Sequence, residues 1–212
     1  MEGWELGAWN LRWRLTGRPC EVNFTGVSPS NNGTSFVANV CPIKVGKFEG
    51  FSWIRCEGKG SFMNSPAVKE FGESRVRAGT VRLVVDLEQC TGMDSTFMGT
   101  LAGLASRISE IGGKVQVTGA DEKIRNSLED LGLDFLMEIN PEDPVWSGLG
   151  EKARDLLKPK VAGMKAGTIL HSRHVLEAHE ILSEANAENK KKFSGVIKLL
   201  GDELGKDSGS SS

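Results

Sequence analysis

Residues 81–120, VRLVVDLEQCTGMDSTFMGTLAGLASRISEIGGKVQVTGA, contain the pattern that decides the fold. The first part, VRLVVDLE, is rich in Val and Leu, which is typical of a strand that is covered on both faces. A helix is then predicted from Asp94 to the pair Gly112-Gly113, because glycine is common just past a helix C-terminus. KVQVTGA follows as a second strand. The stretch therefore predicts a strand, a helix and another strand in succession.

The flanking segments continue this alternation in both directions. Upstream, FSWIRCEG alternates between apolar and polar residues, which favours a strand, and SPAVKEFGESRV predicts a helix with Pro66 in its first turn. Downstream, Asp121 can cap a helix over EKIRNSLEDLG, and LDFLMEI is predicted to be a short final strand. Strands that alternate with helices across short connections predict an α/β domain over residues 47–140. Its single, mostly parallel sheet is expected to have about four strands.

The segments outside this domain differ from it in pattern. Residues 1–44 show neither strand nor helix periodicity, and we interpret them as an irregular N-terminal extension, with the true start of translation near Val45. Residues 141–150 read as a linker. Residues 151–206 predict a helical C-terminal extension, whose amphipathic end either packs on the chain itself or docks elsewhere. Residues 207–212 are expected to be a disordered tail.

Composition limits the classes of function. The chain has 26 Lys and Arg residues against 28 Asp and Glu residues, so its net charge of −2 predicts neither nucleic-acid binding nor a polybasic membrane anchor. No apolar run approaches the ~18 residues of a membrane span, and no secretory signal is recognisable. The four cysteines form no C-x-x-C pair, and Cys56 lies in a predicted buried strand. We therefore expect free thiols and a cytoplasmic location.

The helix that begins at Asp94 has two unlike faces when its residues are placed at about 100° each. One arc is large and apolar and should pack on the sheet: Phe97, Met98, Leu101, Leu104, Ala105 and Ile108. The opposite face carries only small residues: Ser95, Gly99, Ala102, Gly103 and Ser106. A glycine inside a helix costs about 1 kcal/mol relative to alanine, so two of them require a reason. We interpret this face as a docking surface for a partner. The alternative is that the C-terminal segment of the same chain packs there.

Ser95 occupies a position where a phosphate could act as a switch. Asp94 is suited to cap the helix, which leaves the Ser95 hydroxyl beside free backbone N–H groups at the positive end of the helix dipole. The repulsion from Asp94 offsets part of the favourable dipole term, so phosphorylation should be nearly neutral for folding. At an interface, by contrast, the added charge of about −1.5 to −2 units can be repelled strongly by an acidic partner surface, which would weaken binding.

The segment VVDLEQCTGMDSTFMGTLAGLASRISEIGGKVQV resembles the core signature of STAS domains, the fold of bacterial anti-sigma factor antagonists. IRCEGKGSF resembles the first strand and turn of that family, where Ser61 stands near a position that is often acidic, and NSLEDLGLD resembles its helix-to-strand segment. The resemblance implies that a partner serine kinase, which is also the anti-sigma factor, phosphorylates Ser95. Thr96 is the alternative acceptor.

The resemblance also implies how such a protein would act. The unphosphorylated form would bind the kinase and release a sigma factor, and a serine phosphatase would reset the switch. The expected partner-binding residues surround the start of the helix: Asp94, Ser95, Thr96, Gly99, Ala102, Gly103, Ser106 and Ser61. A protein of this kind is not an enzyme and needs no cofactor. The alternative function is a STAS-like scaffold or assembly module without a phosphorylation switch.

Catalytic and metal-binding functions are disfavoured. The three histidines, His171, His174 and His179, lie far in sequence from Ser95, and the chain has no G-x-S-x-G motif, so we expect no hydrolase. Their spacing does not match H-E-x-x-H, so we expect no metal site and interpret them as solvent-facing helix residues.

Overall fold

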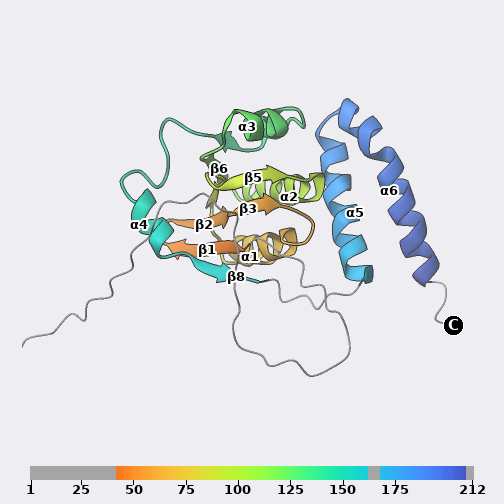
Figure 1. The fold of residues 1–212 in the computed structure, drawn as a ribbon, viewed down its shortest axis with the longest axis horizontal. Helices are drawn as coiled ribbons and strands as arrows, with labels where there is room; N and C mark the ends of the chain where they lie inside the picture. The colour runs from red at the N-terminus through yellow and green to blue at the C-terminus, as the bar shows by residue number, and fades with distance from the viewer. Residues whose placement is uncertain (1–41, 162–167, 209–212) are drawn as a thin grey trace, which may run out of the picture. The chain divides into compact units, whose positions relative to one another are not determined.

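The computed structural model describes residues 42–161 and 168–208 (Figure 1). The expectations for residues 1–41, including the irregular extension, lie outside the described part of the chain. The helices have the following bounds: α1 Ser65–Arg77, α2 Ser95–Glu110, α3 Glu122–Glu129, α4 Gly150–Asp155, α5 Thr168–Ala185 and α6 Ala187–Ser208. A short 3-10 turn covers Leu133–Phe135. None of the helices in the described ranges is both long and apolar enough to span a membrane.

The main sheet has six strands in the order β7-β6-β4-β2-β1-β8. The pairs β2–β4, β4–β6 and β6–β7 are parallel, whereas β1 is antiparallel to both β2 and β8. Two further strands, β3 and β5, form a separate parallel pair. The strand bounds are β1 Ile43–Phe48, β2 Phe51–Cys56, β3 Gly58–Gly60, β4 Arg82–Asp86, β5 Cys90–Met93, β6 Lys114–Thr118, β7 Glu138–Ile139 and β8 Lys158–Lys160.

The predicted α/β class is confirmed, and the sheet is larger than the four strands expected. One added strand is β1, which begins at Ile43 and pairs with β2 over its whole length. Another is β8, which lies within a segment expected to be helical and pairs at the sheet edge with β1. An edge position suits β8 because Pro159, at its centre, has no N–H to donate to a neighbouring strand.

The segment LDFLMEI was predicted to be a strand, and most of it is not. Gly132 adopts a left-handed backbone with φ of 70°, and the 3-10 turn follows directly. Leu133 and Met137 are both buried although they are four residues apart, a spacing that suits a helical turn rather than a strand. Only Glu138–Ile139 pairs with the sheet, as β7.

Side chains on the two faces of the sheet enter two cores. On one face, alternate residues of β2, β4 and β6 pack against α1 and α2, and the core includes Ile54, Val85 and Leu101. On the other face, Phe51, Trp53 and Val84 pack against α4 and the residues around it. The Trp146 ring meets the Trp53 ring edge-on at a centroid distance of 5.5 Å. The segment after β7 therefore covers the face that α1 and α2 leave open.

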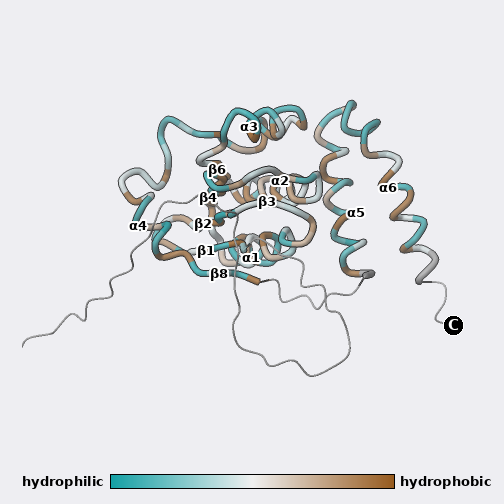
Figure 2. Tube along the Cα trace, viewed as in Figure 1, coloured by the Kyte–Doolittle hydropathy of each residue, from teal (hydrophilic) through white to brown (hydrophobic). Residues whose placement is uncertain are grey.

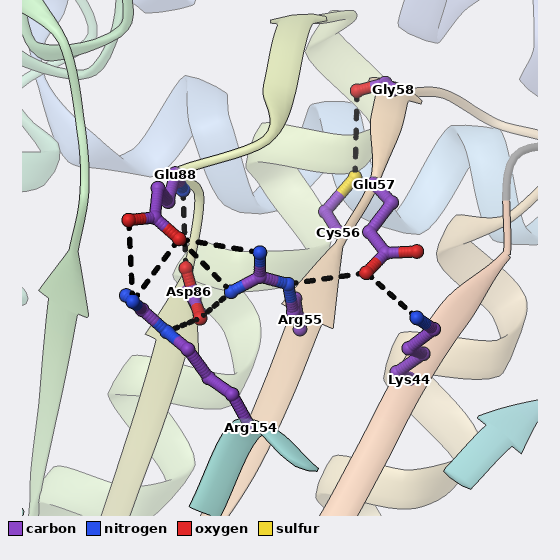
Figure 3. A network of polar contacts seen from close by, with 8 residues as sticks. All are labelled: Lys44, Arg55, Cys56, Glu57, Gly58, Asp86, Glu88 and Arg154. Carbon is purple, nitrogen blue, oxygen red and sulfur yellow. Dashed lines mark hydrogen bonds and ion pairs between the residues drawn. The ribbon is translucent and has the colours of Figure 1, made fainter. Parts of the chain in front are cut away.

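A buried ionic network joins α4 to the carboxyl ends of β2 and β4 (Figure 3). The Asp86 carboxylate, which is fully buried, accepts hydrogen bonds from Arg55 at 2.5 Å and from Arg154 at 2.8 Å. Burial alone would lower the pKa of Arg55, but the charge and hydrogen bond of Asp86, together with Glu88 and Glu57, outweigh it and raise that pKa. Glu88 also forms ion pairs with both arginines, so Arg55 and Arg154 each contact two carboxylates.

Helices α5 and α6 lie side by side as a hairpin at the α2 side of the domain (Figure 1). Hydrophobic and hydrophilic residues alternate along both helices (Figure 2), as expected of helices with one buried side. Leu182 and Phe193 are buried and belong to the same core as α1 and α2. Asn189 donates to the Leu131 carbonyl at 2.9 Å. The hairpin thus packs against the domain.

Candidate functional site

The start of α2 is fixed by Asp94, as the sequence predicted. The Asp94 Oδ1 atom accepts from the Phe97 N–H at 2.8 Å and so caps the helix. The Asp94 N–H donates to the Gly60 carbonyl at 3.0 Å, which ties the helix start to β3. Because of this cap, Ser95 becomes the first residue of α2.

The loop after β3 meets the same carboxylate. The Phe62 N–H donates to Asp94 Oδ2 at 2.8 Å, and Phe62 itself is exposed. Ser61 begins the turn into α1, where its carbonyl accepts from the N–H groups of Asn64 and Ser65. Ser61 and Asp94 therefore lie close together, where the loop after β3 meets the start of α2.

The Ser95 hydroxyl contacts His179, a residue that was expected to face solvent. The Ser95 Oγ atom lies 2.8 Å from Nε2 of His179 on α5, and Nδ1 of the same ring lies 2.7 Å from the Val175 carbonyl oxygen. Ser95 is half-buried, and His179 is only 6% exposed. Thr96, the alternative acceptor, is buried, so its hydroxyl is the less accessible of the two.

A second histidine of α5 makes a matching contact with α1. The His174 Nε2 atom lies 2.8 Å from Oγ of Ser65, the first residue of α1, and 3.4 Å from Oγ1 of Thr100. Burial lowers the pKa of His174, and the nearby Lys69 charge lowers it further. Helix α5 therefore places one imidazole at the first residue of α1 and another at the first residue of α2.

Charged side chains bridge the same three helices. Glu177 of α5 accepts from Lys69 of α1 and from Arg107 of α2, the latter at 3.0 Å, and Arg107 also pairs with Glu73. Burial would raise the pKa of Glu177, but the hydrogen bonds and charges of Lys69 and Arg107 lower it overall. A cavity of about 10 Å³ lies among these groups and has room for about one water molecule.

Helix α5 lies directly on the small-residue face of α2. A Cβ atom on Gly99 would lie 2.8 Å from the Ala178 carbonyl carbon and closer still to its oxygen. A Cβ on Gly103 would lie 2.8 Å from Ile181 Cδ1. Ala102 is buried within the core, and Ser106 is half-buried. The glycines thus allow the backbones of α2 and α5 to approach closely. This is the alternative stated above, in which the C-terminal segment of the same chain packs on the small-residue face.

The interpretation of the histidines as solvent-facing residues was wrong for His174 and His179, which are both buried. Residues 84 apart in sequence form the Ser95–His179 contact, so no local spacing could have indicated it. The small-residue face of α2 was the one local feature of the sequence that indicated a closely packed neighbour on this side of the helix. Among the residues described, no three His, Cys, Asp or Glu side chains are grouped as metal ligands would be.

The thiol that the sequence predicts to be buried is that of Cys56, the last residue of β2. Cys56 and Cys90 are both buried, and within the described residues neither is joined in a disulfide. The hydrogen bond with Cys56, together with backbone hydrogen bonds at Gly92 and Gly60, lowers the pKa of the Cys90 thiol to about 7, against the opposing effect of burial. Cys90 begins β5, the strand that leads into Asp94.

Comparison with known proteins identifies the domain. The family model of the STAS domain matches residues 43–145. A search of curated proteins finds no match. A Bacillus cell-fate determinant, SpoIIAA in its phosphorylated form, is similar at 16% identity, over 53% of this chain and 96% of that one, with a TM-score of 0.42. A protein from Thermotoga maritima whose structure is described as that of an anti-sigma factor antagonist is 20% identical, over 54% and 94% of the two chains, with a TM-score of 0.43. An anti-sigma factor antagonist from Mycobacterium paratuberculosis is 21% identical, over 56% and 98%, with a TM-score of 0.43. The match spans β1 to β7, and residues 43–145 of this chain form a STAS domain.

Proposed function

We propose that this protein is an anti-sigma factor antagonist in which α2 docks on an anti-sigma serine kinase and Ser95 is the residue phosphorylated. Binding of the unphosphorylated protein to the kinase would release a sigma factor, and a serine phosphatase would restore that form. The α5–α6 hairpin then acts as an intramolecular competitor for the same face of α2. The proposal implies a cytoplasmic protein that is itself not an enzyme.

One observation carries this proposal: a helix is seated on the glycine-lined face of α2, directly beside Ser95. The contacts at Gly99 and Gly103 suit an approaching helix backbone, and Lys69 and Arg107 offer positive charge at the edge of that face. A partner that presents a helix with a small residue and a carboxylate could replace α5 contact for contact.

A serine beside a histidine is also the arrangement of nucleophilic catalysis. In such sites a third side chain commonly orients the histidine, whereas here the Val175 carbonyl of the same helix holds Nδ1. The pair lies between α2 and α5, with His179 almost fully buried. The geometry therefore favours a serine that is modified by another protein over a serine that attacks a substrate.

The test is whether Ser95 becomes phosphorylated and whether the hairpin limits this reaction. Ala178→Arg would place a long charged side chain against α2 and release the hairpin, and Ala185→Arg, at an exposed position of α5, is the matched control. Each protein is incubated with ATP and extract of the host cell, and phosphate is followed on a phosphate-affinity gel and mapped by mass spectrometry.

We expect slow phosphorylation of the wild type and of Ala185→Arg, faster phosphorylation of Ala178→Arg, and none in a Ser95→Ala protein. Absence of phosphate at Ser95 in every one of these proteins, and in protein isolated from cells in several growth states, would contradict the proposed function.

The second candidate is a STAS-type scaffold without a switch, and the depth at which the hairpin is buried favours it. Leu182 and Phe193 belong to the main core, and exposing each side chain costs about 1.5–3 kcal/mol. A partner would have to recover this free energy from its own contacts with α2. The phosphorylation experiment decides between the two candidates, because a scaffold needs no phosphate at Ser95.

A further inference from the structure

The two hydrogen bonds of His179 indicate which of its ring nitrogens carries the hydrogen. The Val175 carbonyl can only accept, so Nδ1, 2.7 Å away, must carry the hydrogen. In the neutral ring Nε2 is then an acceptor, and the Ser95 hydroxyl, 2.8 Å away, donates to it. The contact between α2 and α5 at this point therefore depends on the hydroxyl hydrogen of Ser95.

The imidazole has little freedom to move away from Ser95. Its ring packs edge-on against Phe193 of α6, with the ring centroids 5.2 Å apart, and only 6% of the residue is exposed. One residue earlier, the Ala178 backbone lies against Gly99. Withdrawal of the ring thus requires α5 to move away from the start of α2.

We propose that a phosphate on Ser95 and the docked α5–α6 hairpin exclude each other, so that phosphorylation opens the hairpin. This inference rests on the proposed function in taking Ser95 as the residue phosphorylated. Transfer of the γ-phosphoryl group of ATP breaks the Oγ–H bond of Ser95 and the bond between the β- and γ-phosphates. It forms an Oγ–P bond and releases ADP and one proton.

Two consequences of this reaction act against docking. The serine oxygen loses the hydrogen that it donated, so two acceptors, Oγ and His179 Nε2, would face each other at hydrogen-bond distance. The phosphate also needs room for three oxygens, in a space that the imidazole occupies, and it brings about −1.5 to −2 units of charge beside the Asp94 carboxylate. The lack of space for the phosphate and its repulsion from Asp94 both act against the docked state, so the hairpin is expected to leave.

The inference assigns the hairpin a role in the switch cycle. The kinase can reach Ser95 only when α5 is displaced, and the phosphate then prevents α5 from returning. The α2 face stays uncovered until a phosphatase removes the phosphate, after which the hairpin docks again. The small-residue face would then have two occupants, the kinase and α5, both of which the phosphate repels.

The experiment measures hairpin docking in the full-length protein without any kinase. Phosphoserine is incorporated during synthesis at position 95, or at the exposed Ser109 of the same helix as the matched control. Amide hydrogen exchange followed by mass spectrometry then reports on residues 174–185 of α5, and β4 serves as the internal reference for an intact fold. We expect roughly 100-fold faster exchange in α5 with phosphoserine at 95 than at 109, and unchanged exchange in β4. Equal protection of α5 in the two proteins would overturn the inference.

A second variant tests whether His179 is the group that the phosphate displaces. The quantity compared is the exchange rate of α5 with phosphoserine at position 95 divided by its rate with serine there. This ratio should be at least about tenfold smaller in His179→Ala than in the wild type, because the ring that the phosphate displaces is absent. The same ratio in both backgrounds would overturn the role of His179. No kinase is present in these exchange experiments, so a negative result would overturn the opening of the hairpin and not the phosphorylation of Ser95 in the cell. Conversely, a failure to find phosphorylated Ser95 in the cell would overturn the proposed function and not the measured effect of phosphoserine on the hairpin.

Discussion

Replacement of Gly99 by alanine tests the close contact between α2 and α5. A Cβ atom at this position would lie 2.8 Å from the Ala178 carbonyl carbon, whereas ordinary contact begins at 3.4 Å. The two helices must therefore separate by at least about 0.6 Å, the difference between these distances, and overpacking of this kind costs about 1–3 kcal/mol. Alanine also favours helix formation by about 1 kcal/mol over glycine, which acts in the opposite direction.

Gly103→Ala is the matched control, because it gains the same helix propensity with a softer contact. Its Cβ would meet only the side chain of Ile181, most closely the terminal Cδ1 atom, which can rotate away. We therefore expect the docking of α5 to be weaker in Gly99→Ala than in Gly103→Ala by about 1–3 kcal/mol, or about 5- to 150-fold in the exchange of α5 amides.

The measurement is hydrogen exchange of the two variants under identical conditions, supported by urea unfolding. If Gly99→Ala protects α5 as well as Gly103→Ala does, the helices are not in backbone contact at Gly99. Glycine would then not be required at position 99.

Three further predictions concern the residues that hold the hairpin and the sheet. The pKa of His174 is lowered from 6.5 in the folded protein, so below about pH 6.5 the unfolded chain binds the proton first and the wild type should lose stability. In urea unfolding from pH 8 to pH 5, the free energy of unfolding of His174→Gln should therefore depend less on pH than that of the wild type. Asp86→Asn should lower the free energy of unfolding by about 3–5 kcal/mol, because the buried Arg55 charge loses its main partner, and a loss below about 1 kcal/mol would contradict this. Leu182→Ala should cost about 2–5 kcal/mol, whereas Leu199→Ala, at an exposed position, should change the unfolding free energy by less than about 0.5 kcal/mol.

The elements that the sequence predicts well are those whose signals are local. Asp94 and Asp121 each accept a hydrogen bond from an N–H three residues later, as their positions before apolar helix patterns indicated. The Val-rich run from Leu83 to Val85 is buried on both faces, as its composition predicted. Such features depend on a few neighbouring residues, so periodicity and capping rules are sufficient to find them.

The features that the sequence did not reveal depend on distant parts of the chain. Strand β8 has only three residues and no apolar alternation, and it exists because β1 offers an unpaired edge. The contacts of His174 and His179 with Ser65 and Ser95 depend on how the hairpin crosses two helices. The polar histidines suggested exposure, but each is buried because a serine hydroxyl satisfies its ring nitrogen.

The segment after the STAS match has a consequence for shortened versions of this protein. Trp146 covers Trp53, and Arg154 neutralises part of the charge on Asp86, although both residues follow position 145. A truncation at that boundary would expose an aromatic surface to water and leave a buried carboxylate with one arginine fewer. Such a fragment should aggregate or express poorly, and a fragment that keeps both contacts must extend at least through Arg154.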